Sequence, residues 1–458
     1  MYDFFKNKNN YIYIIPIISF FIYSTLAFNT VISFDSSFSV YIAKLPLNEL
    51  IKITASDVHP PLYYIILKYF IAIFSDNIYL LQFFSIIPIL LLSIFGSKKI
   101  KSLFSIKEAI YFQLTILCTP FVISQSINIR MYSWAILFVT LSCIYAVSIL
   151  NDNKKDYIYL TIFSILSAYT HTYALFFISF LYLNLIIYSI IKKSYKEITI
   201  SSLVCLVSYT PWFIVLFRQV KTVSEGFWIS YSSINNYLNI FIIISLCLLI
   251  ISYIFNKNIN FDTRIYYFTV IPFTETLIFI LLYSKYIEPV FLPRYMTVGI
   301  GMLILYISLV ISNLNKKRLT ILSHVLLIIA FTVGYINVFR IQYNKTNKIE
   351  NDYLINILNP KTTIITDISH YATIYSPLAY YKEYGTQYWL QNNKINYAES
   401  INGTIIPIKE IKTLDLNQDI YLIINDVEYL KIIDNFGLKY TLLNDFENFN
   451  VYKIINNN

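Results

Sequence analysis

The sequence predicts a polytopic α-helical membrane protein with about eleven spanning helices, followed by a small exterior C-terminal α/β domain. Of its 458 residues, 57% are hydrophobic and only 13% are charged, whereas soluble globular proteins have roughly 25% charged residues. Long apolar runs follow one another from residue 11 to residue 339, and short basic loops separate them. Together these observations indicate a chain that crosses the membrane many times.

The net charge of +9 does not indicate a nucleic-acid partner. The basic residues lie in short loops between apolar runs, which is the distribution that sets membrane topology. The four cysteines, Cys118, Cys143, Cys205 and Cys247, all lie inside apolar runs. We therefore expect them to be small core residues and not a disulfide or zinc framework.

The first run, 11–32, follows Lys6 and Lys8 and is long enough to cross the bilayer. A cleaved signal peptide is the alternative, but the run is too long for one and lacks a clear small-x-small cleavage site. The later runs also have the length that a spanning helix needs. They are 77–95, 108–125, 132–150, 157–173, 174–191, 198–217, 237–255, 265–284, 295–314 and 319–339.

Positive charge predicts the orientation of these runs. Lysines and arginines cluster in alternate loops, and the positive-inside rule makes those loops and the N-terminus cytoplasmic. The clusters are Lys98, Lys99, Lys101 and Lys107; Lys154 and Lys155; Lys192, Lys193 and Lys196; Lys257 and Arg264; and Lys316, Lys317 and Arg318. The alternation holds only if the apolar segment 62–74 does not span the membrane.

Segment 62–74 is shorter than the roughly 17 residues that a span requires, and it contains Lys68. We expect a helix that lies along the outer membrane interface. The alternative, a true span at this position, would place the cluster from Lys98 to Lys101 outside. The exterior loop 33–76 thus forms part of a membrane domain of residues 1–340.

With an odd number of spans, residues 341–458 are expected outside the cell membrane as a soluble domain. This tail is more polar than the rest of the chain and contains short apolar stretches. The expected elements are strands at 362–366, 421–424, 439–443 and 450–454, and a helix at 427–436 that Gly437 ends. The pattern predicts a small α/β domain.

Polar side chains that can carry out chemistry gather at the expected outer face. Arginine forks bind phosphate, and a carboxylate can act as a general base toward an acceptor hydroxyl or amine. The candidates are Asp35, Asp57 and His59 in the first exterior loop, and Arg130, Tyr132, His171, Trp228, Arg294 and Tyr295 in later ones. Such a set suits a reaction between a lipid-phosphate substrate and an exterior acceptor.

The same residues also have structural explanations. Asp35 could simply end the first span, and His59 could be a loop residue that the following prolines position. Arg130 and Arg294 could be anchors whose side chains reach the membrane interface. His171 could be a structural turn residue, and Trp228 could belong to the interfacial belt of aromatic side chains. Glu275 lies inside an apolar run, where a carboxylate is functional by default, although it could simply pair with a neighbouring helix.

Several motifs come in an order that resembles a known enzyme family. They are Asp35, the run from Asp57 to Tyr64 with sequence DVHPPLYY, Arg130-Met131-Tyr132-Ser133, Pro211-Trp212, Gly226-Phe227-Trp228-Ile229 and Pro293-Arg294-Tyr295. Together they resemble glycosyltransferase family 39, the dolichyl-phosphate-mannose-protein mannosyltransferase-like enzymes of the GT-C fold. The bacterial aminoarabinose transferases are similar in plan. The resemblance covers residues 11–300, and the DVHPPLYY run is its most specific part.

This resemblance implies a sugar donor carried on a polyprenyl phosphate and an inverting transfer. It assigns Asp35 to the vicinity of the acceptor, Asp57 and His59 to a polar pair, and Arg130 and Arg294 to the lipid phosphate. The chain departs from the family where many relatives have acidic residues, because it carries Ser36 and Asn128 at these positions. A divalent metal is a further possibility, with Asp57, His59 and His171 as its candidate ligands.

We therefore predict a membrane glycosyltransferase that moves a sugar from a polyprenyl-phosphate donor to a protein, lipid or glycan acceptor at the outer face. Asp35 is the expected base, with Asp57 as the alternative. Arg130 and Arg294 hold the phosphate, and Tyr132 and Tyr295 lie beside them. A transporter or flippase of lipid-linked sugars is the main alternative, with Glu275 in its favour; a scaffold role would leave the exterior polar set unused.

Overall fold

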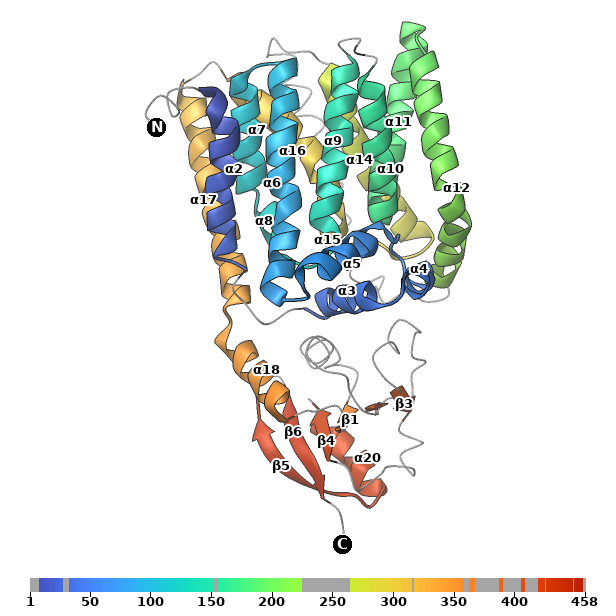
Figure 1. Cartoon of the computed structure of the whole chain (residues 1–458), viewed down its shortest axis with the longest axis vertical. Helices are drawn as coiled ribbons and strands as arrows, with labels where there is room; N and C mark the ends of the chain where they lie inside the picture. The colour runs from blue at the N-terminus through green and yellow to red at the C-terminus, as the bar shows by residue number, and fades with distance from the viewer. Residues whose placement is uncertain are drawn as a thin grey trace.

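The structure is a computed structural model, and it describes residues 8–27, 33–150, 153, 155–224, 264–314, 317–357, 362–366, 387–389, 405–407, 419–424, 426–447 and 449–455. Within this part, the chain forms a bundle of long helices, a layer of shorter helices across one end of the bundle, and a mixed sheet beyond that layer (Figure 1). The predicted polytopic helical fold is confirmed.

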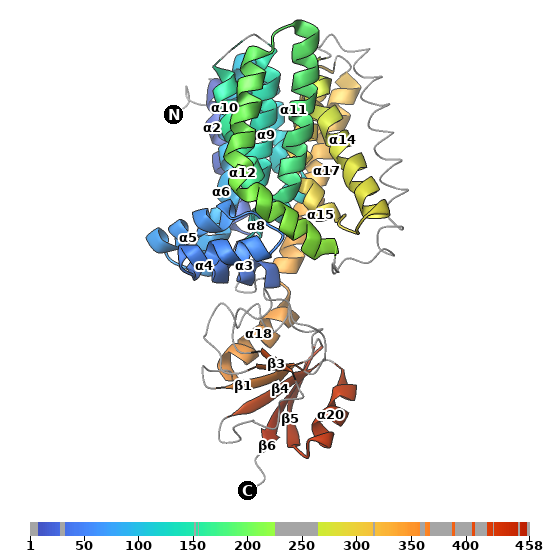
Figure 2. The ribbon, with the colours of Figure 1, turned by 90° about the vertical axis from the view of Figure 1, so that its right-hand side faces the viewer.

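The helices of the bundle lie side by side along its axis (Figures 1 and 2). They are α2 (Tyr11–Ser24), α6 (Ile78–Leu103), α7 (Ile106–Cys118), α8 (Pro120–Ile127), α9 (Tyr132–Ile149), α10 (Asp156–Thr170), α11 (Thr172–Lys192), α12 (Lys196–Ser224), α14 (Arg264–Tyr286), α16 (Ile300–Ser312) and α17 (Lys317–Gln342). The predicted span 237–255 lies outside the described residues.

Within the described residues, seven helices are long and apolar enough to cross a membrane, or eight if α7 and α8 form one broken span. These two helices meet at an angle of 63°, because Pro120 begins α8 and cannot continue the hydrogen-bond ladder of α7. α2 and α10 fall below this length at 14 and 15 residues, yet both stand in the bundle (Figure 1).

Three shorter helices, α3 (Phe34–Lys44), α4 (Leu47–Ser56) and α5 (Leu62–Phe74), lie across one end of the bundle (Figures 1 and 2). α5 occupies the segment predicted to lie along the interface. Pro46 is the N-cap of α4 and Pro61 is the N-cap of α5, so each connecting turn ends at a proline, which lacks the backbone N–H needed inside a helix. Lys68 Nζ donates to the Leu45 carbonyl at 2.6 Å, which ties α5 to the end of α3.

The segment before α16 packs unusually close to the centre of the bundle. A Cβ atom added at Gly301 would lie 1.7 Å from Thr140 Oγ1, and one at Gly299 would lie 2.3 Å from the Phe177 ring. Only glycine fits at these positions, so η2 (Thr297–Gly299) and α16 can approach α9 and α11. This contact fixes the short helix α15 (Pro293–Met296), which carries two of the candidate site residues.

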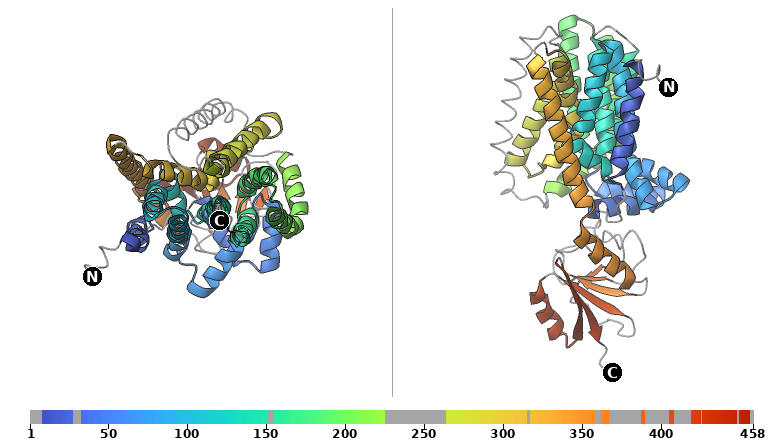
Figure 3. Two further views of the ribbon diagram at one scale, coloured as in Figure 1. Left: turned by 90° about the horizontal axis from the view of Figure 1, so that it is seen from above. Right: turned by 90° about the vertical axis from the view of Figure 1, so that its left-hand side faces the viewer.

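The C-terminal part contains α18 (Lys345–Ile357) and a six-stranded sheet of order β3-β2-β1-β4-β6-β5. Its elements are β1 (Thr363–Thr366), β2 (Gln387–Trp389), β3 (Ile405–Pro407), β4 (Ile420–Ile424), η5 (Val427–Tyr429), α20 (Leu430–Asn435), β5 (Lys439–Asp445) and β6 (Asn450–Ile455). β1 to β4 are mutually parallel, and β6 joins β4 and β5 in antiparallel pairs. The sheet lies at the same end of the bundle as α3 to α5 (Figure 3).

The four predicted strands and the predicted helix before Gly437 are present. β1 and β4 are buried along their whole length, as expected of short apolar central strands, and Thr363 pairs with Ile420 in their register. Gly437 adopts a φ of +69°, the left-handed conformation with which glycine ends a helix. β2 and β3 were not predicted, because strands of three residues carry almost no periodic signal.

Candidate functional site

Asp35 lies in the first turn of α3, at the bundle end covered by the short helices. The Ser33 side chain caps this helix by accepting from the Ser36 backbone N–H. A negative side chain in a first turn is also favoured by the helix dipole. The sequence therefore holds this carboxylate at a defined position, and its side chain stays 32% exposed.

Arg294, on α15, forms an ion pair with this carboxylate. Its Nη1 atom donates to Asp35 Oδ2 at 3.0 Å, across 259 positions of sequence. Pro293 starts α15, and the packing of Gly299 and Gly301 holds the segment in place. The Arg294 side chain is 42% exposed, so a ligand can reach the pair from solvent.

Arg130 lies in the turn between α8 and α9 and also contacts α3. Unlike Arg294, it is buried. Its Nη1 donates to the Asp35 carbonyl at 3.2 Å, to Ser39 Oγ at 3.1 Å and to Tyr64 Oη at 3.3 Å. Its Nε has no partner. Among the described residues, no carboxylate lies within ion-pair distance of this guanidinium. A buried guanidinium without a direct ion-pair partner is costly, so the arrangement favours an anionic ligand.

An aromatic and imidazole cluster lies beside the ion pair. His171 has its ring centroid 4.9 Å from His59, 5.6 Å from Tyr132 and 5.4 Å from Tyr295. Tyr295 also packs on Tyr173 at 5.1 Å. The structure thus brings together His59, His171, Tyr132 and Tyr295, which the sequence places in four separate segments.

His171 both ends α10 and caps α11, as the predicted turn residue. Its Nδ1 accepts from the Tyr173 backbone N–H at 3.0 Å, so the proton of the neutral ring is on Nε2. Nε2 of His171 and Nδ1 of His59 are buried without partners. Burial and the nearby Arg130 and Arg294 lower the pKa of His171 to about 3, and burial with His171 also lowers the pKa of His59.

These shifts predict a pH-dependent stability. Between the ordinary pKa of 6.5 and the folded value of about 3, the unfolded chain binds a proton at His171 that the folded chain does not. The contribution of the neutral His171 to the free energy of unfolding is therefore fully present above pH 6.5, and it falls as the pH is lowered toward 3. The variant His171→Asn keeps a capping acceptor but cannot titrate. Its melting temperature in detergent should fall less between pH 7 and pH 5; an unchanged slope would contradict a buried neutral His171.

Asp57 lies at the end of α4, and its environment differs from that of Asp35. Burial raises the pKa of its carboxyl, and the Val58 backbone and Arg130 oppose this rise. Gln219 Nε2 donates to the Asp57 carbonyl and, at 3.0 Å, to the Thr54 carbonyl, which joins α12 to this turn. The two predicted carboxylates are thus held by different helices and in different surroundings.

Ser39 and Tyr64 are site residues that the sequence analysis did not name as candidates. Ser39 follows Asp35 by four positions, so both lie on one face of α3. This spacing was the signal that could have identified it. Tyr64 ends the DVHPPLYY run, but its contact with Arg130 crosses 66 positions and is visible only in the structure.

Trp228 and Glu275 are the two remaining residues that the sequence singled out. Trp228 lies outside the described residues. Glu275, on α14, accepts a hydrogen bond from Asn184 Nδ2 of α11 at 2.5 Å. A protein partner thus accounts for this intramembrane carboxylate. In the described part of the chain, no three His, Cys, Asp or Glu side chains come together as a metal site.

No protein-family model and no curated protein matches the sequence. Solved structures of ArnT from Cupriavidus metallidurans are similar in fold. The apo crystal structure superposes with a TM-score of 0.65 over 97% of this chain and 98% of that chain, at 10% identity. The crystal structure bound to undecaprenyl phosphate gives a TM-score of 0.63 over 96% and 97%, also at 10% identity. The chain therefore has the GT-C fold that its motifs predicted.

Proposed function

We propose that this chain is a membrane glycosyltransferase that moves a sugar from a polyprenyl-phosphate donor to an acceptor at the outer face of the membrane. One observation carries the proposal. Asp35 is held by two arginines, and one of them, Arg130, is buried with no carboxylate partner among the described residues. A base beside one paired arginine and one arginine without a direct carboxylate partner suits an anionic lipid donor. An ArnT structure of the same fold has undecaprenyl phosphate bound.

The donor phosphate would bind between Arg130 and Arg294, with Tyr132 and Tyr295 at its sides. Guanidinium forks form strong, directional hydrogen bonds to phosphate oxygens. The same cations stabilise the charge that collects on the phosphate as the bond to the sugar breaks. The leaving group is thus a phosphate anion, and it needs no strong general acid.

Asp35 acts as the general base in this proposal. The acceptor oxygen or nitrogen attacks the anomeric carbon while its proton passes to the Asp35 carboxylate. The bond from the anomeric carbon to the phosphate oxygen breaks, and polyprenyl phosphate leaves with the electron pair. A single displacement of this kind inverts the anomeric configuration. The 32% exposure of Asp35 leaves room for an acceptor to approach.

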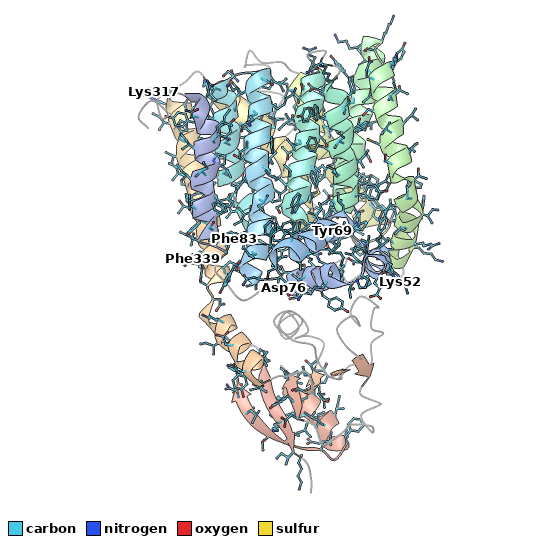
Figure 4. All side chains as sticks on the ribbon, viewed as in Figure 1. Lys52, Tyr69, Asp76, Phe83, Lys317 and Phe339 are labelled. Carbon is cyan, nitrogen blue, oxygen red and sulfur yellow. The ribbon has the colours of Figure 1, made fainter. Side chains whose placement is uncertain are left out.

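Sidedness forms part of the proposal and has its own test. The bundle end with Asp35 is expected outside, together with the C-terminal sheet, because the basic loops lie at the other end. In a chain whose native cysteines are replaced by serine, cysteine at Asn435 should react with an impermeant maleimide in intact cells. Cysteine at Lys317, which lies at the opposite bundle end (Figure 4), should react only after permeabilisation. The reverse pattern would reject the topology.

One assay distinguishes transfer of the sugar from transport of the intact lipid donor. The purified chain in proteoliposomes is supplied with radiolabelled polyprenyl-phosphate sugars and with candidate acceptors. We expect the label to move to an acceptor and free polyprenyl phosphate to form. Movement of intact labelled donor between leaflets, without cleavage, would instead establish the flippase alternative.

A further inference from the structure

The Asp35 carboxylate and its backbone have separate partners. Among the described residues, Arg294 alone donates a hydrogen bond to the carboxylate, through the single contact from Nη1 to Oδ2. Arg130 and Ser39 instead donate to the Asp35 carbonyl oxygen, at 3.2 and 2.9 Å. The carboxylate can therefore lose Arg294 while the helix turn that carries it stays fixed.

We propose that Arg294 is shared in turn by Asp35 and the donor phosphate, so that donor binding displaces Asp35 from Arg294 and releases it to act as the base. This inference rests on the proposed function. It makes Arg294 a residue that sets the order of binding, with the lipid donor first and the acceptor second.

Three features support the exchange. The pair is half-exposed, at 32% for Asp35 and 42% for Arg294, so an incoming phosphate can reach it. The phosphodiester of the donor carries one negative charge and two non-bridging oxygens, as many as a carboxylate, so it can take the place of Asp35 on the guanidinium. While Oδ2 accepts from Arg294, the ion pair fixes the orientation of the carboxylate, so that the carboxylate is not free to turn toward the acceptor. The free chain thus keeps its base occupied until the donor arrives.

The buried Arg130 keeps Asp35 in place when Arg294 leaves the carboxylate. It joins α3 to α5 through three groups, the Asp35 carbonyl, Ser39 Oγ and Tyr64 Oη, and none of these is the Asp35 carboxylate. When Arg294 turns to the phosphate, Asp35 therefore remains beside the reacting carbon.

A double-mutant cycle on binding tests the proposal without any need for activity. The affinity of the full chain for undecaprenyl phosphate is measured in nanodiscs for the parent, Asp35→Asn, Arg294→Gln and the double variant. Removing the competitor should tighten binding in the Asp35→Asn variant about two- to five-fold, the range expected of a half-exposed ion pair. In the Arg294→Gln background, the same substitution should have a smaller effect, because no pair is left to break.

Asp76→Asn is the matched control. It removes the same charge from the same layer of helices (Figure 4), where Asp76 pairs with Lys44 at 2.5 Å. It should leave the affinity unchanged, and the melting temperatures of all variants should match the parent. Weaker binding by Asp35→Asn would show that Asp35 positions Arg294 for the phosphate, and would overturn the exchange. Equal effects of Asp35→Asn in both backgrounds, or tightening by Asp76→Asn, would also overturn it. If the parent chain did not bind undecaprenyl phosphate at all, this result would contradict the proposed function itself.

Discussion

Asp35→Asn is expected to lower turnover by about 10²- to 10⁴-fold, the contribution typical of a general base. The amide keeps the size of the carboxylate but cannot accept the proton. The cap from Ser33 and the contacts of Arg130 with the Asp35 carbonyl do not involve the carboxylate, so α3 should keep its place. The measurement is the initial rate of sugar transfer at saturating donor, with the melting temperature as a check of folding.

Asp57→Asn gives the internal comparison for this result. Asp57 lies at the end of α4, and Arg294 pairs with Asp35 and not with Asp57. Its substitution should therefore reduce turnover less than that of Asp35. If Asp35→Asn kept nearly normal turnover and Asp57→Asn abolished it, the base would be Asp57. If neither variant changed turnover, the displacement mechanism proposed here would be wrong.

The second large effect concerns the arginines. Arg294→Lys keeps the charge but loses the planar fork, so we expect donor KM to rise by about ten-fold with kcat little changed. Arg130→Lys should raise donor KM similarly and also lower kcat, because lysine cannot reproduce the contacts with Ser39, Tyr64 and the Asp35 carbonyl. The measurement is a full kcat and KM determination for both variants.

Arg340→Lys, in the last turn of α17, is the control for these substitutions because it makes the same change away from the site. It should leave both constants unchanged. Normal donor affinity in a double variant with alanine at Arg130 and Arg294 would mean that the phosphate binds elsewhere.

Much of the fold could be predicted because the length of an apolar run and the charge of the loops beside it can be read directly along the sequence. Span length and the alternation of basic loops placed helices at ten of the eleven predicted runs, the remaining run lying outside the described residues. They also identified α5 as a helix that does not span. The break between α7 and α8 was missed, although Pro120 marks it, because the apolar run continues through it.

The site was less predictable, because its decisive contacts join distant positions. No local pattern shows that Arg294 reaches Asp35 over 259 positions, or that the rings of His59 and His171 lie in contact. The family resemblance named these residues but not their partners. Arg130 could have been a surface anchor by sequence, whereas the structure buries it against α3 and α5.

The most direct test is a structure of the full chain in nanodiscs with undecaprenyl phosphate. We predict the phosphate at the end of the bundle covered by α3 to α5, with its oxygens about 2.7–2.9 Å from the guanidinium nitrogens of Arg294. Arg130 should lie beside it, still bonded to the Asp35 carbonyl, and the Asp35 carboxylate should have left Arg294. A lipid phosphate bound away from both arginines, or at the opposite end of the bundle, would contradict the account.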